Sequence, residues 1–268
     1  MKINESNMLE VIPIKAFNDN YLWLFHAQGS NQACIVDPGD ADPVLRYLDA
    51  NNLQLAAIFI THHHADHTGG IEALTQRYHV PVYGPASERI PAVSHSLREG
   101  DTVEMFGTNF EILAIPGHTL DHIAYHAAGN VSANGPVLFC GDTLFAGGCG
   151  RVFEGTYPMM YQSLQKLARL SPETQVFCAH EYTLANLKFA LALSPENEVL
   201  SARFQREQRK REKDIPTVPT SVGLELATNP FLRCDDQVLR STAASHAGRI
   251  LDDPAEVFGL IRQWKDSF

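Results

Sequence analysis

The 268-residue sequence has little positive charge. Lysine and arginine together number 21, against 31 aspartate and glutamate residues, which gives a formal net charge of −10 with neutral histidines. Binding to a nucleic-acid backbone requires a basic surface, so this balance argues against that class of function. We therefore expect no nucleic-acid partner.

Paired cysteines are also missing. The five cysteines are an odd number, and no two of them are spaced as Cys-x-x-Cys. Cys140 and Cys178 lie within apolar runs, where a cysteine usually behaves as a small buried hydrophobic residue. This pattern favours a reducing compartment over a disulfide scaffold, and we expect a cytoplasmic protein.

Long apolar runs and familiar nucleophile motifs are lacking as well. No run approaches the ~18 residues that suggest a membrane span, and Met1–Glu10 is polar, without a secretory apolar segment. The chain has no Gly-x-Ser-x-Gly elbow, and Gly147–Gly150 lacks the Gly-Lys-Ser/Thr ending of a phosphate loop. We expect a soluble chain whose chemistry does not require a serine nucleophile.

The most informative stretch is a histidine cluster. Four histidines and one aspartate lie within His62–His67, directly after the apolar run 55–60. Side chains two apart in an extended segment point the same way, roughly 6–7 Å apart, so His62 and His64 can bind one cation. Asp66 and His67 follow where a helix reaching Tyr78 begins, so they point elsewhere. The stretch suggests two metal sites, although a polar loop with chance histidines is the alternative.

Four apolar, strand-like runs end at a potential metal ligand. The run 55–60 precedes the histidine cluster, and three further runs precede His118, Asp142 and His180. Loops at one edge of a rigid sheet commonly bring site residues together. We predict a mixed sheet covered by helices, of the α/β (α+β) class.

The character of the chain changes after Tyr182. Helical patterns follow over 184–193, 196–213, 235–245 and 253–265, and we interpret the basic residues of the second as a solvated face. We predict a catalytic domain over residues 1–183 and an α-helical, substrate-binding domain over residues 184–268.

With these residues assembled, the chain resembles the metallo-β-lactamase superfamily of binuclear hydrolases. In that superfamily the metal ligands lie in four motifs along the sequence: T-H-x-H-x-D-H, then P-G-H-T, then G-D-T, then a late histidine. Within that superfamily the chain is similar to the glyoxalase II, or hydroxyacylglutathione hydrolase, family. The motifs that carry this closer resemblance are Thr61–Gly70, Cys140–Phe145, Gly148–Arg151, Phe153–Thr156, His180–Thr183 and Asn229–Arg233.

The resemblance implies an αββα sandwich with a C-terminal helical domain, and two divalent metal ions, most simply zinc, with iron or manganese as alternatives. It implies that His62, His64 and His118 bind one ion. It implies that Asp66, His67 and His180 bind the other, with Asp142 bridging. The residues that would grip glutathione are Arg151, Tyr182 and Arg233.

The resemblance also implies a mechanism, with Asp66 and Asp142 as the catalytic carboxylates. Two cations roughly 3.5–4 Å apart lower the pKa of a bridging water from about 15.7 toward 7, and the hydroxide attacks the thioester carbonyl. The substrate is an S-(2-hydroxyacyl)glutathione such as S-D-lactoylglutathione, as in methylglyoxal detoxification. A thiol of pKa near ~8.5 leaves as thiolate without a strong general acid.

Two positions depart from the pattern of some family members. Asp236 stands where a lysine follows the Arg233 position, and Phe153 stands where a tyrosine follows the Arg151 position. Strand alternation turns His63 away from its neighbours, so we do not expect it to be a ligand. His122, four residues after His118, is expected to play a supporting role.

Other functions remain open from the sequence. A lactonase, a β-lactamase, another thioesterase or a sulfur dioxygenase would keep the same fold. An RNA-processing nuclease is disfavoured by the net charge. A zinc-stabilised binding protein without catalysis would need closed coordination. We expect a monomer.

Overall fold

The computed structural model describes residues 8–268, which form two compact units. Unit 1 comprises residues up to Ala114 together with 121–141 and 173–180, and unit 2 comprises residues 115–120, 142–172 and 181–268. Most of the N-terminal segment for which we predicted no secretory signal lies outside the described residues. The domain boundary at residue 183 stays a prediction.

Unit 1 contains a sheet with two halves. Its first half runs in the order β1 (Leu9–Ala16), β2 (Asn20–Ala27), β3 (Gln32–Val36), β4 (Gln54–Phe59), β5 (Val82–Pro85) and β6 (His95–Leu97). Its second half runs in the order β7 (Thr102–Met105), β8 (Thr108–Ala114), β9 (Ile123–Ser132), β10 (Gly135–Gly141) and β13 (Gln175–Cys178). A single residue pair, Leu9 with Ser132, joins β1 to β9. Parallel and antiparallel pairs both occur, so the predicted mixed sheet is confirmed.

Aromatic side chains from both halves meet in the core of unit 1. The ring of Phe110 on β8 lies 5.3 Å from that of Phe25 on β2 and 5.6 Å from that of Phe59 on β4. Tyr125 on β9 stacks on Phe59 at 4.5 Å and donates its hydroxyl proton to the Ile60 carbonyl. The two halves therefore face each other across a buried aromatic layer, as in a sandwich.

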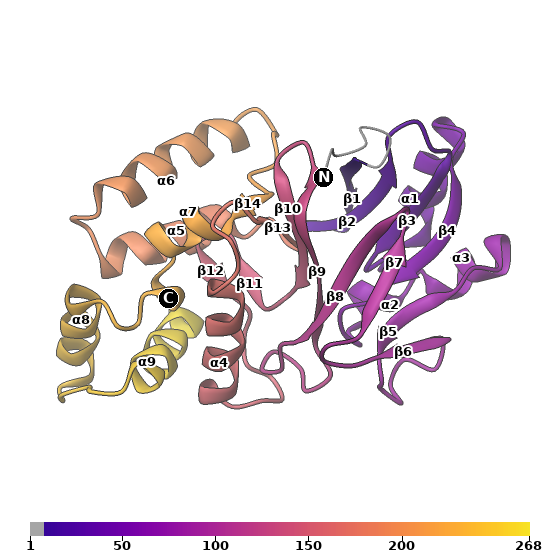
Figure 1. The fold of residues 1–268 in the computed structure, drawn as a ribbon. Coiled ribbons are helices and arrows are strands. Elements are labelled where there is room, and N and C mark those ends of the chain that lie inside the picture. Colours follow the sequence, from indigo (N-terminus) through magenta and orange to yellow (C-terminus); the bar gives the residue numbers. More distant parts are fainter. Residues whose placement is uncertain (1–7) are drawn as a thin grey trace. The chain divides into compact units, whose positions relative to one another are not determined.

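Helices cover the outer face of the first half (Figure 1). Asp40 caps α1 (Ala41–Ala50), which has Pro43 in its first turn and buries Val44 and Leu48. The short α2 (Ala65–Thr68) leads into α3 (Ile71–Tyr78), which packs on β4. The aliphatic layer under these helices fixes the direction in which the chain leaves β4, and hence the place of the histidine cluster.

Unit 2 contains most of the helices and one small hairpin. The hairpin pairs β11 (Leu144–Phe145) with β12 (Gly148–Cys149). The other elements are α4 (Tyr157–Ala168), α5 (Thr183–Leu193), α6 (Glu198–Arg211), β14 (Thr220–Ser221), α7 (Val222–Thr228), the 3-10 helix η2 (Pro230–Leu232), α8 (Gln237–Ala247) and α9 (Pro254–Ser267). The four C-terminal helices expected from the sequence are present, whereas β9, α4 and α7 were not anticipated. No helix among the described residues combines the length and apolarity that a membrane crossing requires.

A buried ionic network anchors the hairpin of unit 2. Arg203 Nη2 lies 2.6 Å from Glu225 Oε1, and both side chains are almost fully buried. Glu225 Oε2 accepts from the backbone N–H of Gly147 and from Asn229 Nδ2, which also donates to the Gly148 carbonyl. The interpretation of α6 as a solvated basic face is therefore wrong for Arg203. Its charge offsets the buried Glu225 carboxylate, whose interior position was not visible in the sequence.

We expect Glu225→Gln to destabilise the protein by about 3–5 kcal/mol, because it removes one partner of a buried ion pair. Denaturant unfolding of the metal-loaded protein measures this loss. The matched control is Glu256→Gln, which breaks the half-exposed pair with Arg249 and should cost at most about 1 kcal/mol. Equal losses in the two variants would contradict a special role for the buried network.

Candidate active site

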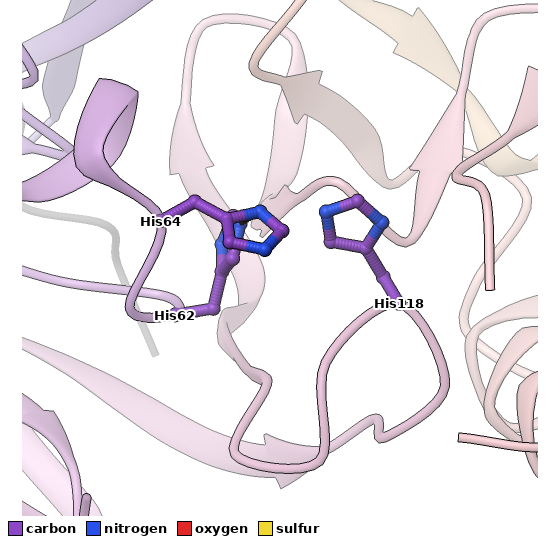
Figure 2. Close-up of side chains that lie close together, drawn as sticks. All are labelled: His62, His64 and His118. Carbon is purple, nitrogen blue, oxygen red and sulfur yellow. Dashed lines mark hydrogen bonds between the residues drawn. The ribbon is translucent and has the colours of Figure 1, made fainter. Parts of the chain in front are cut away.

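The loop after β4 brings two histidine nitrogens together. The Thr61 backbone N–H and hydroxyl both donate to Asp37, each at 2.7 Å, which fixes the chain where it leaves the sheet. His62 Nε2 then lies 3.0 Å from His64 Nδ1 (Figure 2). The expectation that alternate side chains of this stretch point the same way is confirmed for this pair. His118, also labelled in Figure 2, belongs to unit 2 and is described with that unit below.

The histidine between them points elsewhere. His63 Nδ1 lies 3.0 Å from the carboxylate of Asp121, and its Nε2 lies 2.9 Å from Arg89 Nη1. His122 stacks on His62 with ring centroids 4.5 Å apart and an interplanar angle of 14°. His122 immediately precedes β9 rather than lying on a helix, and it supports His62 through this ring contact.

A three-residue group forms where α2 faces the end of β13. Potential ligand atoms of Asp66, His67 and His180 all lie within 4.8 Å of one another. Asp66 Oδ2 is 3.4 Å from His67 Nε2 and 3.5 Å from His180 Nε2. Gly39 permits this placement of α2, because a Cβ there would lie 1.8 Å from the Asp66 carbonyl oxygen.

Outer carboxylates hold both imidazoles of this group by their other nitrogen. His67 Nδ1 lies 3.0 Å from Asp37 Oδ2, and His180 Nδ1 lies 2.9 Å from Asp19 Oδ1. The hydrogen bond to Asp19 fixes the tautomer and ring orientation of His180, so its Nε2 lone pair is directed toward Asp66, whereas Asp37 lies against His67 as a close charged neighbour. Asn20 Nδ2 donates to the same Asp66 oxygen at 3.0 Å.

Unit 2 contains one further pair of an imidazole, anchored through its other nitrogen, and a carboxylate. His118 Nδ1 donates to the Arg151 carbonyl at 2.8 Å, and His118 Nε2 lies 3.4 Å from Asp142 Oδ2. Gly150 allows the local turn, because a Cβ there would lie 1.9 Å from the Asp142 carbonyl oxygen. A turn at residues 146–147 joins β11 to β12, and the segment Gly147–Gly150 carries no phosphate-loop motif.

The donor sets of these groups fit a divalent metal. Two ligand atoms at about 2.0–2.2 Å from one tetrahedral ion lie roughly 3.3–3.6 Å apart, which matches the 3.4 and 3.5 Å separations around Asp66 and Asp142. Imidazole nitrogen and carboxylate oxygen suit zinc, iron or manganese. Of the seven predicted ligands, five lie in unit 1, and His118 and Asp142 lie in unit 2. The complete set of seven stays a prediction.

Unit 2 also contains a cavity of about 390 Å³ beside His118 and Asp142. Two of the predicted substrate residues, Arg151 and Tyr182, line it, and so does Phe153. Arg233 is not among its lining residues and instead pairs with Asp236, Nη2 to Oδ2, at 2.7 Å. Asp236 therefore neutralises Arg233 locally.

Cys149 lines the same cavity, but its thiol is not activated. Burial raises the pKa of Cys149 to about 11, even though Arg262 beside it favours the thiolate. The thiol is therefore neutral at pH 7, which agrees with a nitrogen-and-carboxylate metal site that does not use it.

Four residues that shape these sites were not predicted from the sequence. Asp19 and Asp37 hold the ligand imidazoles, and Asp37 follows an apolar strand in the same way as the predicted ligands do. A search for ligand-type residues directly after apolar, strand-like runs would have found Asp37, because it follows the run 33–36. Arg262 and Lys265 line the cavity from α9, and basic residues of an ordinary helix give no such signal.

Comparisons with known proteins agree with this fold and chemistry. A model of the metallo-beta-lactamase superfamily matches residues 20–180, and a model described as hydroxyacylglutathione hydrolase C-terminus matches residues 181–268. The structure of ETHE1 from Myxococcus xanthus superposes with a TM-score of 0.65 at 26% identity, covering 96% of this chain and 90% of that one. TTHA1623 in a di-iron-bound form gives 0.57 at 25% identity, covering 83% of this chain and 100% of that one.

The fold and the His/Asp groups define a metal-dependent hydrolase of the metallo-β-lactamase superfamily, to which the chain belongs. Curated relatives narrow the assignment. A hydroxyacylglutathione hydrolase of Nitrosomonas eutropha is 51% identical over 263 residues, 97% of this chain and 100% of that protein. One of Pseudomonas paraeruginosa is 49% identical over 262 residues, with the same coverage. Within the superfamily, the chain is a member of the hydroxyacylglutathione hydrolase (glyoxalase II) family.

We expect Asp37→Asn to weaken metal binding about 10- to 100-fold, because the amide presents a donor where Thr61 and His67 need an acceptor. Competition with a chromophoric chelator measures the affinity. Asp121→Asn is the matched control, since it breaks a carboxylate–imidazole contact to His63, which is not a predicted ligand. An unchanged affinity in Asp37→Asn, or the same loss in both variants, would refute the positioning role.

Proposed function

We propose that the protein hydrolyses S-(2-hydroxyacyl)glutathione thioesters, such as S-D-lactoylglutathione, to glutathione and the free 2-hydroxy acid. The observation that carries this proposal is the full-length match, near 50% identity, to relatives named hydroxyacylglutathione hydrolase. The reaction would complete the detoxification of methylglyoxal, with D-lactate as the acid product.

The metal centre of this proposal holds two divalent ions. His62, His64 and His118 would hold one, Asp66, His67 and His180 the other, and Asp142 both. The support lies within each unit: the Nδ1 atoms of His67, His180 and His118 each contact an oxygen acceptor, and their Nε2 atoms lie 3.4–3.5 Å from the carboxylate of Asp66 or Asp142. The di-iron form of the neighbour TTHA1623 agrees with a count of two. Zinc is the ion we propose, with iron and manganese as the alternatives that the donor atoms allow.

Bound metal would lower the pKa of water far enough to supply hydroxide near neutral pH. The side chains of the protein position the carboxylate and imidazole groups that would bind the metal. Asn20 orients the Asp66 carboxylate, Asp19 keeps the His180 imidazole in one tautomer, and Asp37 lies against the His67 imidazole. Hydroxide adds to the acyl carbon, the carbon–sulfur bond breaks, and the glutathione thiol leaves as thiolate because its pKa is near ~8.5. No protein nucleophile or strong general acid is needed.

The substrate would be held by its glutathione portion. We assign this to Arg151, Tyr182 and Arg233, since a guanidinium binds a carboxylate in bidentate fashion. Arg151 and Tyr182 line the 390 Å³ cavity beside Asp142, which supports their assignment. Arg233 would have to exchange its contact with Asp236 for the substrate.

A cytoplasmic monomer fits these assignments. All five cysteines are buried and form no disulfide in the described chain, as expected in a reducing compartment. The monomer is our proposal for the oligomeric state, and all proposed ligands and substrate contacts belong to one polypeptide.

We expect removal of metal by a chelator to abolish thioester hydrolysis, and addition of zinc to restore it. Loss of thioester absorbance follows the activity, and elemental analysis should give two ions per chain. Unchanged turnover after verified metal loss would reject the mechanism, and one ion per active chain would reject the two-ion site. A lactone and a penicillin tested alongside distinguish the alternative, another hydrolase of the superfamily, which would prefer one of them.

We expect Arg151→Gln and Arg233→Gln each to raise KM for S-D-lactoylglutathione about tenfold with little change in kcat, because each removes a charge-assisted hydrogen bond to the bound carboxylate. Steady-state kinetics measures both parameters. Arg77→Gln, which breaks a surface pair with Asp49, is the control. An unchanged KM in Arg233→Gln would remove that residue from the substrate site while leaving Arg151 in it.

A further inference from the structure

Glu181 is a buried carboxylate of unit 2 that lies directly before Tyr182. Its side chain is only 9% exposed, and Glu181 is not among the residues that line the cavity. Burial of a carboxylate is costly unless hydrogen bonds replace its contacts with water. The contacts of Glu181 therefore indicate which part of the chain it holds.

Thr217, in the connector between α6 and β14, binds both oxygens of this carboxylate. The backbone N–H of Thr217 donates to Glu181 Oε2 at 2.9 Å, and its hydroxyl donates to Glu181 Oε1. Arg211 at the end of α6 lies 3.9 Å from the same Oε2. Thr217 is buried, so removal of the carboxylate would leave its N–H without an acceptor, at a cost of about 1–3 kcal/mol.

The same contacts hold the first turn of α5. The hydroxyl oxygen of Thr217 also lies 2.6 Å from Thr183 Oγ1, at the residue where α5 begins. Tyr182 occupies the N-cap position of α5, and a tyrosine side chain does not cap a helix as Ser, Thr, Asp or Asn would. The position of this helix start therefore depends on the flanking contacts of Glu181.

The first turn of α5 also forms part of the cavity wall. Tyr182 and Asn186, one turn apart, both line the cavity, and the Tyr182 carbonyl accepts from the backbone N–H of Asn186 at 2.9 Å. The Tyr182 ring lies edge-on to Phe145, with ring centroids 5.4 Å apart. A displacement of about 1 Å in a binding group can cost about 100-fold in activity, so the position of this turn matters for the bound substrate.

We propose that Glu181 is a positioning residue for substrate binding. It holds the connector between α6 and β14 against the first turn of α5 and so fixes Tyr182 in the wall of the cavity. This inference rests on the proposed function, because it takes Tyr182 as a contact of the glutathione portion. Glu181 acts through Tyr182 and not by contact with the substrate, since it does not line the cavity.

Two substitutions of Glu181 test the role on the metal-loaded protein, well below the unfolding midpoint of each variant. Glu181→Ala removes both contacts to Thr217. It should raise KM for S-D-lactoylglutathione about tenfold with little change in kcat, and Kd for the non-hydrolysed thioether S-methylglutathione by the same factor, measured by calorimetry. Glu181→Gln can accept from the Thr217 N–H and donate to the Thr217 hydroxyl oxygen. This conservative variant should therefore keep both constants within about threefold of the parent.

A double-mutant cycle with Tyr182→Phe distinguishes positioning from a general loss of stability. Without the Tyr182 hydroxyl, its position no longer affects binding, so Glu181→Ala should change Kd for S-methylglutathione by less than about twofold in that background. If Glu181→Ala does not fold, Thr217→Val takes its place in the cycle, because it removes only the hydroxyl contact. Glu196→Ala, at an exposed glutamate between α5 and α6 and outside the cavity, is the control and should change neither constant.

Unchanged KM and Kd in Glu181→Ala would overturn the inference, as would equal losses in Glu181→Ala and Glu181→Gln. A full loss that persists in the Tyr182→Phe background would overturn it as well. In these cases the parent still binds S-methylglutathione and cleaves the thioester, so the proposed function stands. If the parent hydrolyses a lactone or penicillin but neither binds S-methylglutathione nor cleaves the thioester, the proposed function and this inference fail together.

Discussion

The carboxylate of Asp37 connects the parts of unit 1 on which the site depends. It accepts from the backbone and hydroxyl of Thr61, where the chain leaves β4, and it lies 3.0 Å from His67 on α2. Asp37 is almost fully buried and has a φ of 51°, a left-handed conformation that aspartate tolerates better than most residues. One carboxylate thus orients both the loop that carries His62 and the imidazole of His67.

A buried carboxylate organises unit 2 in a similar way. Glu225 pairs with Arg203 and accepts from Gly147 in the hairpin that lines the cavity. Asn229 joins the same network, which connects the Asn-Pro-Phe sequence to the hairpin that lines the cavity, although the two lie far apart along the chain. In both units, a carboxylate removed from water accepts hydrogen bonds at both of its oxygens, and a network of this kind allows few arrangements of its neighbours.

Much of this structure was predictable because its signals are local. Alternation placed His62 and His64 together and His63 apart. Apolar runs gave most strands of unit 1. The strand β9 was missed, although its first half is buried and its second half largely exposed, because no clear alternation runs through 123–132.

The rest depends on partners distant in sequence. Arg203 resembles its solvated neighbours on α6, and only the fold brings Glu225 to it. Asp236 stands where some family members have a lysine, and only the structure shows that it pairs with Arg233, so that its charge is compensated locally.

Net charge and local charge have different consequences for an anionic substrate. At physiological ionic strength, exposed charges are screened beyond about 8 Å, so the overall −10 acts weakly on a molecule already inside the cavity. Arg151, Arg262 and Lys265 line the cavity of unit 2, where a partly desolvated wall screens charge less than the open surface does. A small anion that enters this cavity meets positive charge, although the chain as a whole is acidic. The net charge of the chain and the charge of one cavity act over different distances, so the sign of the first does not determine the sign of the second.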